Sequence, residues 1–185
     1  MFSTAQCKSI GLILDLSIRQ MNGRRIVDVV KKQISQWIRQ TLEDSEDYFY
    51  LYHPEITVPT ISRGESLACV NNFNTEGWLF DLVTAVAQTF CVVHDQDADA
   101  HKAFLLISDR MQNSNSLRTL KAMQAKYQTD CRFLLCGIGK QYNKSVLNEY
   151  ASVPNVVVKH LVGPEDLASG LSEFWSKLLE AHGEA

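Results

Sequence analysis

The sequence predicts an α/β protein with a doubly wound, Rossmann-like, mostly parallel sheet of six strands, one antiparallel edge strand, and helices on both faces. Two observations support this prediction. Short apolar segments alternate with longer segments in which apolar residues recur at helical spacing, which is the pattern of β-α-β units. One early pair of strand-like segments has a connection too short for a crossover helix, so one strand of that pair must be antiparallel.

Length, charge and cysteine content narrow the class of protein. The chain has 185 residues, of which 45% are hydrophobic, and a net charge of −3. We expect a single domain over residues 1–185 with a core over about 9–180, which could be one domain of a longer protein. The slight negative charge disfavours nucleic-acid binding. No apolar segment approaches the roughly 18 residues that span a bilayer, and the odd number of cysteines favours reduced thiols. We therefore expect a cytoplasmic, intracellular protein without a membrane anchor or signal peptide.

The first half of the chain contains three predicted strands and one predicted helix. Residues 10–14 form a continuous apolar segment that is typical of a buried strand. Residues 24–42 have an apolar residue on each helical turn and predict an amphipathic helix, and the acidic residues 43–47 predict a solvated loop. Residues 48–52 and 66–70 are the two strands that we expect at the antiparallel edge.

The second half alternates between helices and buried strands. The pattern predicts helices over residues 78–92, 117–127, 146–150 and from 164 onward, and strands over 103–107, 132–139 and 156–161. Pro164 suits the first position of the last helix, because its fixed φ is preorganised for a helical turn.

Oxygen-bearing side chains follow the ends of the buried strands. Asp15 and Ser17 come directly after the first strand, Asp109 follows the strand over 103–107, and Thr75 lies in the loop between them. Because the carboxyl ends of parallel strands meet at one edge of the sheet, we expect these side chains to lie close together. Carboxylate and hydroxyl oxygens suit a hard cation such as Mg²⁺.

On these residues the chain resembles the von Willebrand factor A domain family, over nearly its whole length. The family's metal-ion-dependent adhesion site (MIDAS) combines an Asp-x-Ser-x-Ser turn, a threonine of a later loop and an aspartate after a later strand. The resemblance assigns Asp15 and Ser17 to the turn, Thr75 to the threonine and Asp109 to the aspartate. It implies a non-enzymatic scaffolding module that binds a protein partner within a larger assembly.

Two arginines depart from the family pattern. Arg19 stands where the family has the third residue of the turn, a serine that binds the metal, and Arg110 follows Asp109 where glycine is common. A guanidinium stays protonated, opposes a dication, and can pair with either carboxylate. We therefore expect a degenerate site that needs no cofactor. The alternative is that Arg19 points into solvent and the remaining ligands still hold Mg²⁺.

A partner-binding surface is predicted from the loops at the strand tips. Its candidate residues are Arg19, Met21, Arg24, Arg110 and Met111. Clustered arginines and methionines would suit an acidic partner that also has apolar groups. The alternative is that the arginines solvate helix starts and the methionines fill gaps in the packing.

Two other functions remain open from the sequence. A hydrolase could use Asp15 and Asp109 with Mg²⁺, although phosphate-loop and nucleophile-elbow motifs are missing and Ser17 stands where a phosphatase would have its second acid. A homo-oligomer could form through the edge region, residues 48–70. We expect a binding module rather than an enzyme.

Overall fold

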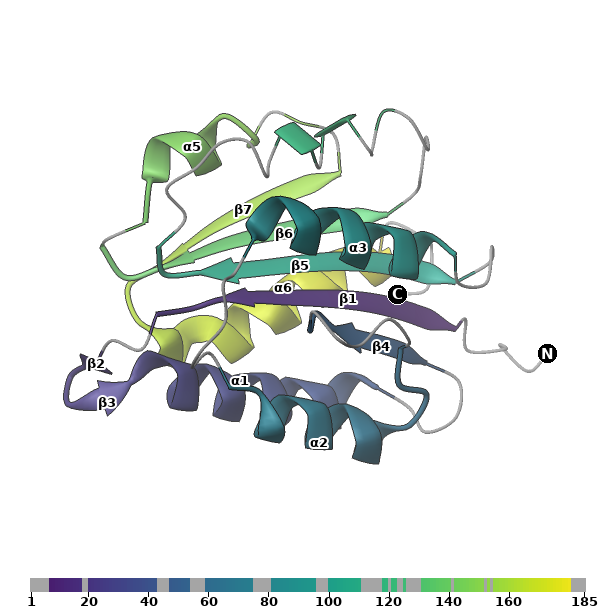
Figure 1. Cartoon of the computed structure of the whole chain (residues 1–185), viewed down its shortest axis with the longest axis horizontal. Helices are drawn as coiled ribbons and strands as arrows, with labels where there is room; N and C mark the ends of the chain where they lie inside the picture. The colour runs from purple at the N-terminus through teal and green to yellow at the C-terminus, as the bar shows by residue number, and fades with distance from the viewer. Residues whose placement is uncertain are drawn as a thin grey trace.

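The computed structural model describes residues 7–17, 20–42, 47–53, 59–74, 81–95, 100–110, 118–119, 121–122, 125, 131–140, 142–151, 153 and 155–180. Within these residues the main sheet has five parallel strands with helices on both faces, which confirms the predicted α/β fold (Figure 1). The strand order is β4-β1-β5-β6-β7. The strand bounds are β1 Lys8–Asp15, β4 Tyr48–Leu51, β5 His101–Ser108, β6 Arg132–Ile138 and β7 Val156–Leu161.

The central strand β1 is buried along its whole length and pairs with β4 on one side and β5 on the other. Its alternate side chains enter different halves of the core, so that Leu12 packs on one face of the sheet and Ile13 on the other. The pairing with β5 is continuous to the last residue of both strands, where Asp15 lies opposite Ser108. This register brings the ends of both strands to the same edge of the sheet.

Helices cover both faces of the sheet. α1 (Ile26–Thr41) and α6 (Leu167–Glu180) contribute to one core cluster, and α3 (Leu82–His94) and α5 (Lys144–Asn148) contribute to the other (Figure 1). The short helix η1 (Pro164–Asp166) leads into α6. None of the described helices is long and apolar enough to cross a membrane. Most of the helix predicted over 117–127 lies outside the described residues.

The predicted strand over residues 66–70 is wrong, because this segment belongs to helix α2 (Arg63–Asn72). The Ser62 side chain caps α2 by accepting a hydrogen bond from the backbone N–H of Glu65, at 3.2 Å. Ser62 and Glu65 have the spacing of a capping box, a helix-start signal that precedes the apolar residues. In the described residues, the antiparallel edge is limited to one bridge between Phe49 and Thr60.

The acidic segment after α1 is not solvated throughout. Asp47 is 4% exposed, and its carboxylate accepts hydrogen bonds from the backbone N–H and the ammonium of Lys8, at 2.9 and 3.3 Å. This pair ties the start of β1 to the segment that enters β4. The other acids of the segment, in residues 43–46, lie outside the described residues.

A small hairpin separates β1 from α1. Strands β2 (Gln20–Met21) and β3 (Arg24–Arg25) pair antiparallel around Asn22 and Gly23, whose φ angles are +52° and +75°. Positive φ at both central residues is the geometry of a tight hairpin turn, and Asn-Gly is its preferred sequence. The predicted helix therefore begins at Ile26, after the hairpin, rather than at residue 24.

None of the five cysteines, all of which are described, forms a disulfide. Cys131 and Cys136 are buried, whereas Cys91 is exposed on α3. Burial raises the pKa of the Cys136 thiol to about 12, so this thiol is chemically inert at neutral pH.

Candidate functional site

The candidate site lies where β1 and β5 end. In Figure 1 the arrowheads of these strands point to the left, toward β2 and β3. Asp15 ends β1 and Ser108 ends β5 in register, and the backbone N–H of Asp109 donates to the carbonyl of Asp15 at 3.3 Å. The pairing of the two strands thus fixes where Asp15, Ser108 and Asp109 can lie.

Asp15 has a protein donor on each carboxylate oxygen. The hydroxyl of Ser108 donates to Oδ2 at 2.7 Å, and Nε of Arg110 donates to Oδ1 at 2.6 Å. Asp15 is 4% exposed, while the side chain of Arg110 is 40% exposed. A buried carboxylate is therefore neutralised by a guanidinium that reaches it from the surface.

Asp109 binds the chain that follows β1. Its Oδ1 accepts the backbone N–H of Ser17 at 2.9 Å, and its Oδ2 accepts the Ser17 hydroxyl at 2.5 Å. Asp109 is only 2% exposed, so these hydrogen bonds lie in a low-dielectric environment and are strong. They hold the loop after β1 against the tip of β5.

In this arrangement, protein donors occupy the carboxylates that the family resemblance assigns to Mg²⁺. Mg²⁺ requires close oxygen ligands in nearly octahedral geometry. Both oxygens of Asp15 and both oxygens of Asp109 already accept hydrogen bonds from protein donors, and the cation of Arg110 lies against Asp15. Within the described part of the chain, no group of three or more His, Cys, Asp or Glu side chains could hold a metal.

The structure brings together four of the predicted site residues, Asp15, Ser17, Asp109 and Arg110. The predicted Arg19, Thr75 and Met111 lie outside the described residues. Ser108 was not predicted as a site residue, although a hydroxyl next to Asp109 at a strand end was a visible signal for it.

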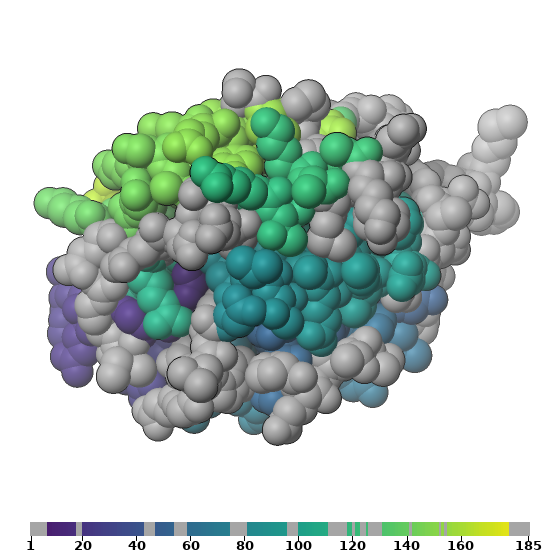
Figure 2. Space-filling view, turned by 45° about the horizontal axis from the view of Figure 1, so that its top comes forward, coloured from purple at the N-terminus to yellow at the C-terminus, as the bar shows by residue number. Residues whose placement is uncertain are grey.

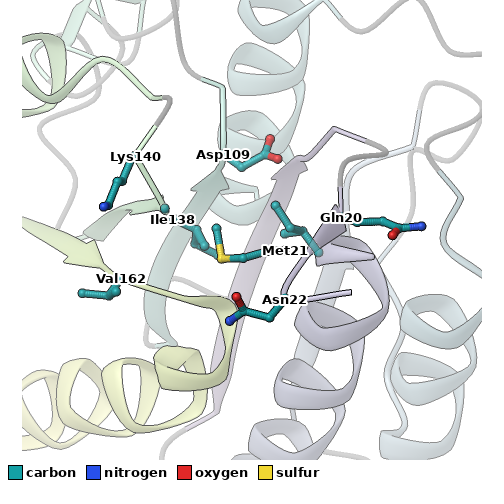
Figure 3. Close-up of a pocket in the computed structure, with 9 residues that line it drawn as sticks. Gln20, Met21, Asn22, Asp109, Ile138, Lys140 and Val162 are labelled. Atoms are coloured by element: carbon teal, nitrogen blue, oxygen red, sulfur yellow. The ribbon is translucent and has the colours of Figure 1, made fainter. Parts of the chain in front are cut away.

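A pocket of about 330 Å³ opens beside Asp109, and we call it the tip pocket. It is lined by Gln20, Met21, Asn22, Ile26, Asp109, Ile138, Gly139, Lys140 and Val162. Figure 3 shows the Met21 side chain in its centre, pointing toward Ile138, with Asp109 and Lys140 above and Asn22 and Val162 below. Of the predicted partner-binding residues, Met21 lines this pocket.

One wall of the tip pocket contains a close approach between the hairpin and the residue that follows β6. Gly139 has a φ of +80°, and a Cβ atom added there would lie 2.8 Å from the terminal methyl of Met21. Glycine is required at this position by the backbone conformation. The sequence could not reveal this contact, because Met21 belongs to the hairpin and Gly139 follows β6.

Basic side chains surround the hairpin. A shallow polar surface next to the tip pocket includes Arg24, Arg25 and Lys32, with Asp28 and Glu165 as its acids. Lys140 on the wall of the tip pocket is also exposed. Figure 2 shows the purple residues of the N-terminal segment, which includes the hairpin, at the left end of the molecule. Among the described residues that line the tip pocket and this surface, there are four cations, Arg24, Arg25, Lys32 and Lys140, and three acids, Asp28, Asp109 and Glu165, whereas the chain as a whole has a net charge of −3.

Comparison with known proteins identifies the fold. No protein-family model matches the sequence. No curated protein matches it either. The solved structures that it resembles include the von Willebrand factor type A protein from Catenulispora acidiphila, with a TM-score of 0.73 and 19% identity over 95% of this chain. This chain spans only 43% of the length of that protein.

Two further structures extend the comparison. BatB from Bacteroides thetaiotaomicron has a TM-score of 0.72 and 12% identity, over 94% of this chain and 99% of its own. Proximal thread matrix protein 1 from the mussel byssus, solved with a zinc-occupied MIDAS motif, has a TM-score of 0.62 and 14% identity, over 91% of this chain and 47% of its own. The chain therefore has the von Willebrand factor A fold.

Proposed function

We propose that this chain is a protein-binding module whose partner docks on the strand-tip face, and that the module needs no metal. The observation that supports this proposal is the ion pair at the tips, in which Arg110 Nε lies 2.6 Å from Asp15 Oδ1. In a MIDAS, a metal ion supplies the positive charge beside the strand-tip aspartates. Here a side chain of the protein supplies that charge at the same carboxylate.

The surroundings of the ion pair support the choice of the strand-tip face. The tip pocket shares Asp109 with the site, and the neighbouring surface adds Arg24, Arg25 and Lys32. A concave apolar surface with a charged rim is the usual anatomy of a protein interface. We therefore propose a scaffolding role for the module within a larger assembly.

We also propose that the chain is not an enzyme. Asp15 and Asp109 are the acids on which a hydrolase of this fold would depend. Both are nearly buried, and each accepts two hydrogen bonds from protein donors, so neither carboxylate is available to activate a water molecule.

Site-specific photo-cross-linking in cells of the source organism tests this proposal. A photoreactive residue at Gln20 or Lys140 reports on the strand-tip face. The matched control is Gln40, which is exposed near the end of α1 and about 21 Å along the helix from Ile26. We expect one protein to be captured at both tip positions and not at Gln40, with or without a metal chelator. Capture only at Gln40, or capture that the chelator abolishes, contradicts the proposal.

A further inference from the structure

We propose that the tip pocket binds one aliphatic side chain of a protein segment, and that acidic residues flank this side chain in the partner. This inference rests on the proposed function and specifies the chemistry of the partner. It follows from three features of the tip pocket, namely its apolar lining, its preformed wall and the arrangement of charges around it.

Apolar side chains line the pocket from its floor to its mouth, beside the polar residues Gln20, Asn22, Asp109 and Lys140. Ile26 and Ile138 are buried at the floor, and Val162 is 80% exposed at the mouth. Among the described residues, the only exposed large hydrophobic ones are Val162, at 80%, and Ile61, at 55%. A volume of about 330 Å³ lies at the lower end of the roughly 300–1,000 Å³ of ligand pockets, which suits a side chain rather than a large cofactor.

The pocket is preformed. The Asn22–Gly23 turn fixes the hairpin, and Met21 is held against Gly139 on the opposite wall. A preformed pocket spares a ligand much of the ordering cost of binding. Met21 also adapts to the shape of an aliphatic group, because its side chain is unbranched and polarizable.

The charges favour acids at the rim, and the apolar lining disfavours them inside. Lys140, Arg24 and Lys32 are exposed cations at or near the mouth, and they outnumber the exposed acids of the neighbouring surface, Asp28 and Glu165. Inside, the apolar side chains of Met21, Ile26 and Ile138 would remove the water around an acidic side chain that entered, which costs free energy. An aliphatic side chain therefore suits the interior, whereas acidic neighbours in the partner suit the cationic rim.

Three short synthetic peptides test the inference on the full chain. The first has a central leucine between glutamates, the second replaces that leucine with alanine, and the third places the leucine between lysines. Methyl signals of Met21, Ile26, Ile138 and Val162 in an NMR titration report on the pocket. We expect the first peptide to shift these signals, the alanine peptide to bind at least about tenfold more weakly, and the lysine peptide to leave them unchanged. Equal binding of the leucine and alanine peptides overturns the inference, as does the absence of shifts with the first peptide.

Two matched variants locate the binding. Val162→Glu places an acid at the mouth, on a side chain so exposed that folding is unaffected, and should abolish binding of the first peptide. Ile61→Glu makes the same change on a side chain that is 55% exposed and does not line the pocket, and should leave binding unchanged. Equal effects of the two substitutions overturn the inference.

The outcomes of the peptide test and of the cross-linking test distinguish a wrong partner chemistry from a wrong proposed function. A partner that is captured at Gln20, together with no binding of the glutamate–leucine peptide, overturns the stated partner chemistry and leaves the proposed function standing. No capture at the tip positions and no peptide binding overturn both.

Discussion

The ion pair between Arg110 and Asp15 gives a prediction with a definite size. The Arg110→Ala substitution leaves the Asp15 carboxylate, which is 4% exposed, with the Ser108 hydroxyl and without its cation. Breaking a fully buried ion pair costs about 3–5 kcal/mol. Because the Arg110 side chain is 40% exposed, water replaces part of the lost interaction, and a charge-assisted hydrogen bond of about 1.5–3 kcal/mol is the better measure. We expect the free energy of unfolding to fall by about 2 kcal/mol.

Urea unfolding of the single variants Arg110→Ala and Asp15→Asn and of the double variant measures this quantity. The double variant should be more stable than the sum of the two single effects predicts, because it leaves no unpaired charge behind. Arg110→Lys is the control that keeps the charge but loses the planar geometry. A loss below about 0.5 kcal/mol for Arg110→Ala would refute the assignment of Arg110 as the counterion of Asp15.

Calorimetry with Mg²⁺ and Mn²⁺ extends the same reasoning to the metal. We expect no binding in the micromolar range for the natural sequence, because Arg110 opposes a dication at Asp15. Arg110→Ala removes that opposition and should increase the affinity for both ions. Micromolar binding by the natural sequence would contradict the proposed metal-free site.

Three further predictions concern the core. Gly11→Ala should lower the free energy of unfolding by about 1–3 kcal/mol or more in a urea titration, because its Cβ would lie 2.5 Å from a methyl group of α3. Gly64→Ala is the control: there is open space around Gly64, so this substitution should not destabilise the chain. At pH 8, iodoacetamide should label the exposed Cys91 in the folded chain. It should label Cys136 only after unfolding, because burial raises the pKa of this thiol to about 12. Mass spectrometry distinguishes the two sites. Burial raises the pKa of Tyr50 from its ordinary 10.0 to about 12, so the unfolded chain loses this proton at a lower pH than the folded chain does. The free energy of unfolding should therefore fall as the pH rises from 10.0 to about 12, and this fall should be smaller in the Tyr50→Phe variant.

Much of the fold was predictable because its strands are buried on both faces. Such strands form continuous apolar segments, and the segments at residues 10–14 and 103–107 therefore indicated β1 and β5 correctly. The position of Asp15 beside Ser108 and Asp109 followed from the same reasoning, since parallel strands end at one edge of the sheet. The sequence also indicated that an arginine could pair with one of the strand-tip aspartates, but the choice of Asp15 over Asp109 required the structure.

Other features could not be predicted, or were missed, for identifiable physical reasons. Residues 66–70 have apolar residues that suit either a strand or a helix, and the Ser62–Glu65 capping box that favours the helix lies before them. The burial of Asp47 depends on Lys8, 39 residues away, and no local pattern contains that information. The tip pocket arises where the hairpin meets the ends of three strands, so its shape depends on tertiary packing alone.

The register of β1 has a consequence for how the chain acquires its structure during synthesis. β1 precedes the other strands of the main sheet in the chain, yet its longest partner, β5, lies 93 residues later, as the pair Asp15 and Ser108 shows. At about 5–20 residues per second, a ribosome takes roughly 5–20 s to add that length. During this interval β1 has only β4 as a strand partner in the main sheet, and its apolar edge toward β5 stays open. The nascent chain is therefore most prone to misassociation before residue 101 emerges. The interaction of Lys8 with Asp47 helps to hold β1 in place until β5 has been synthesised.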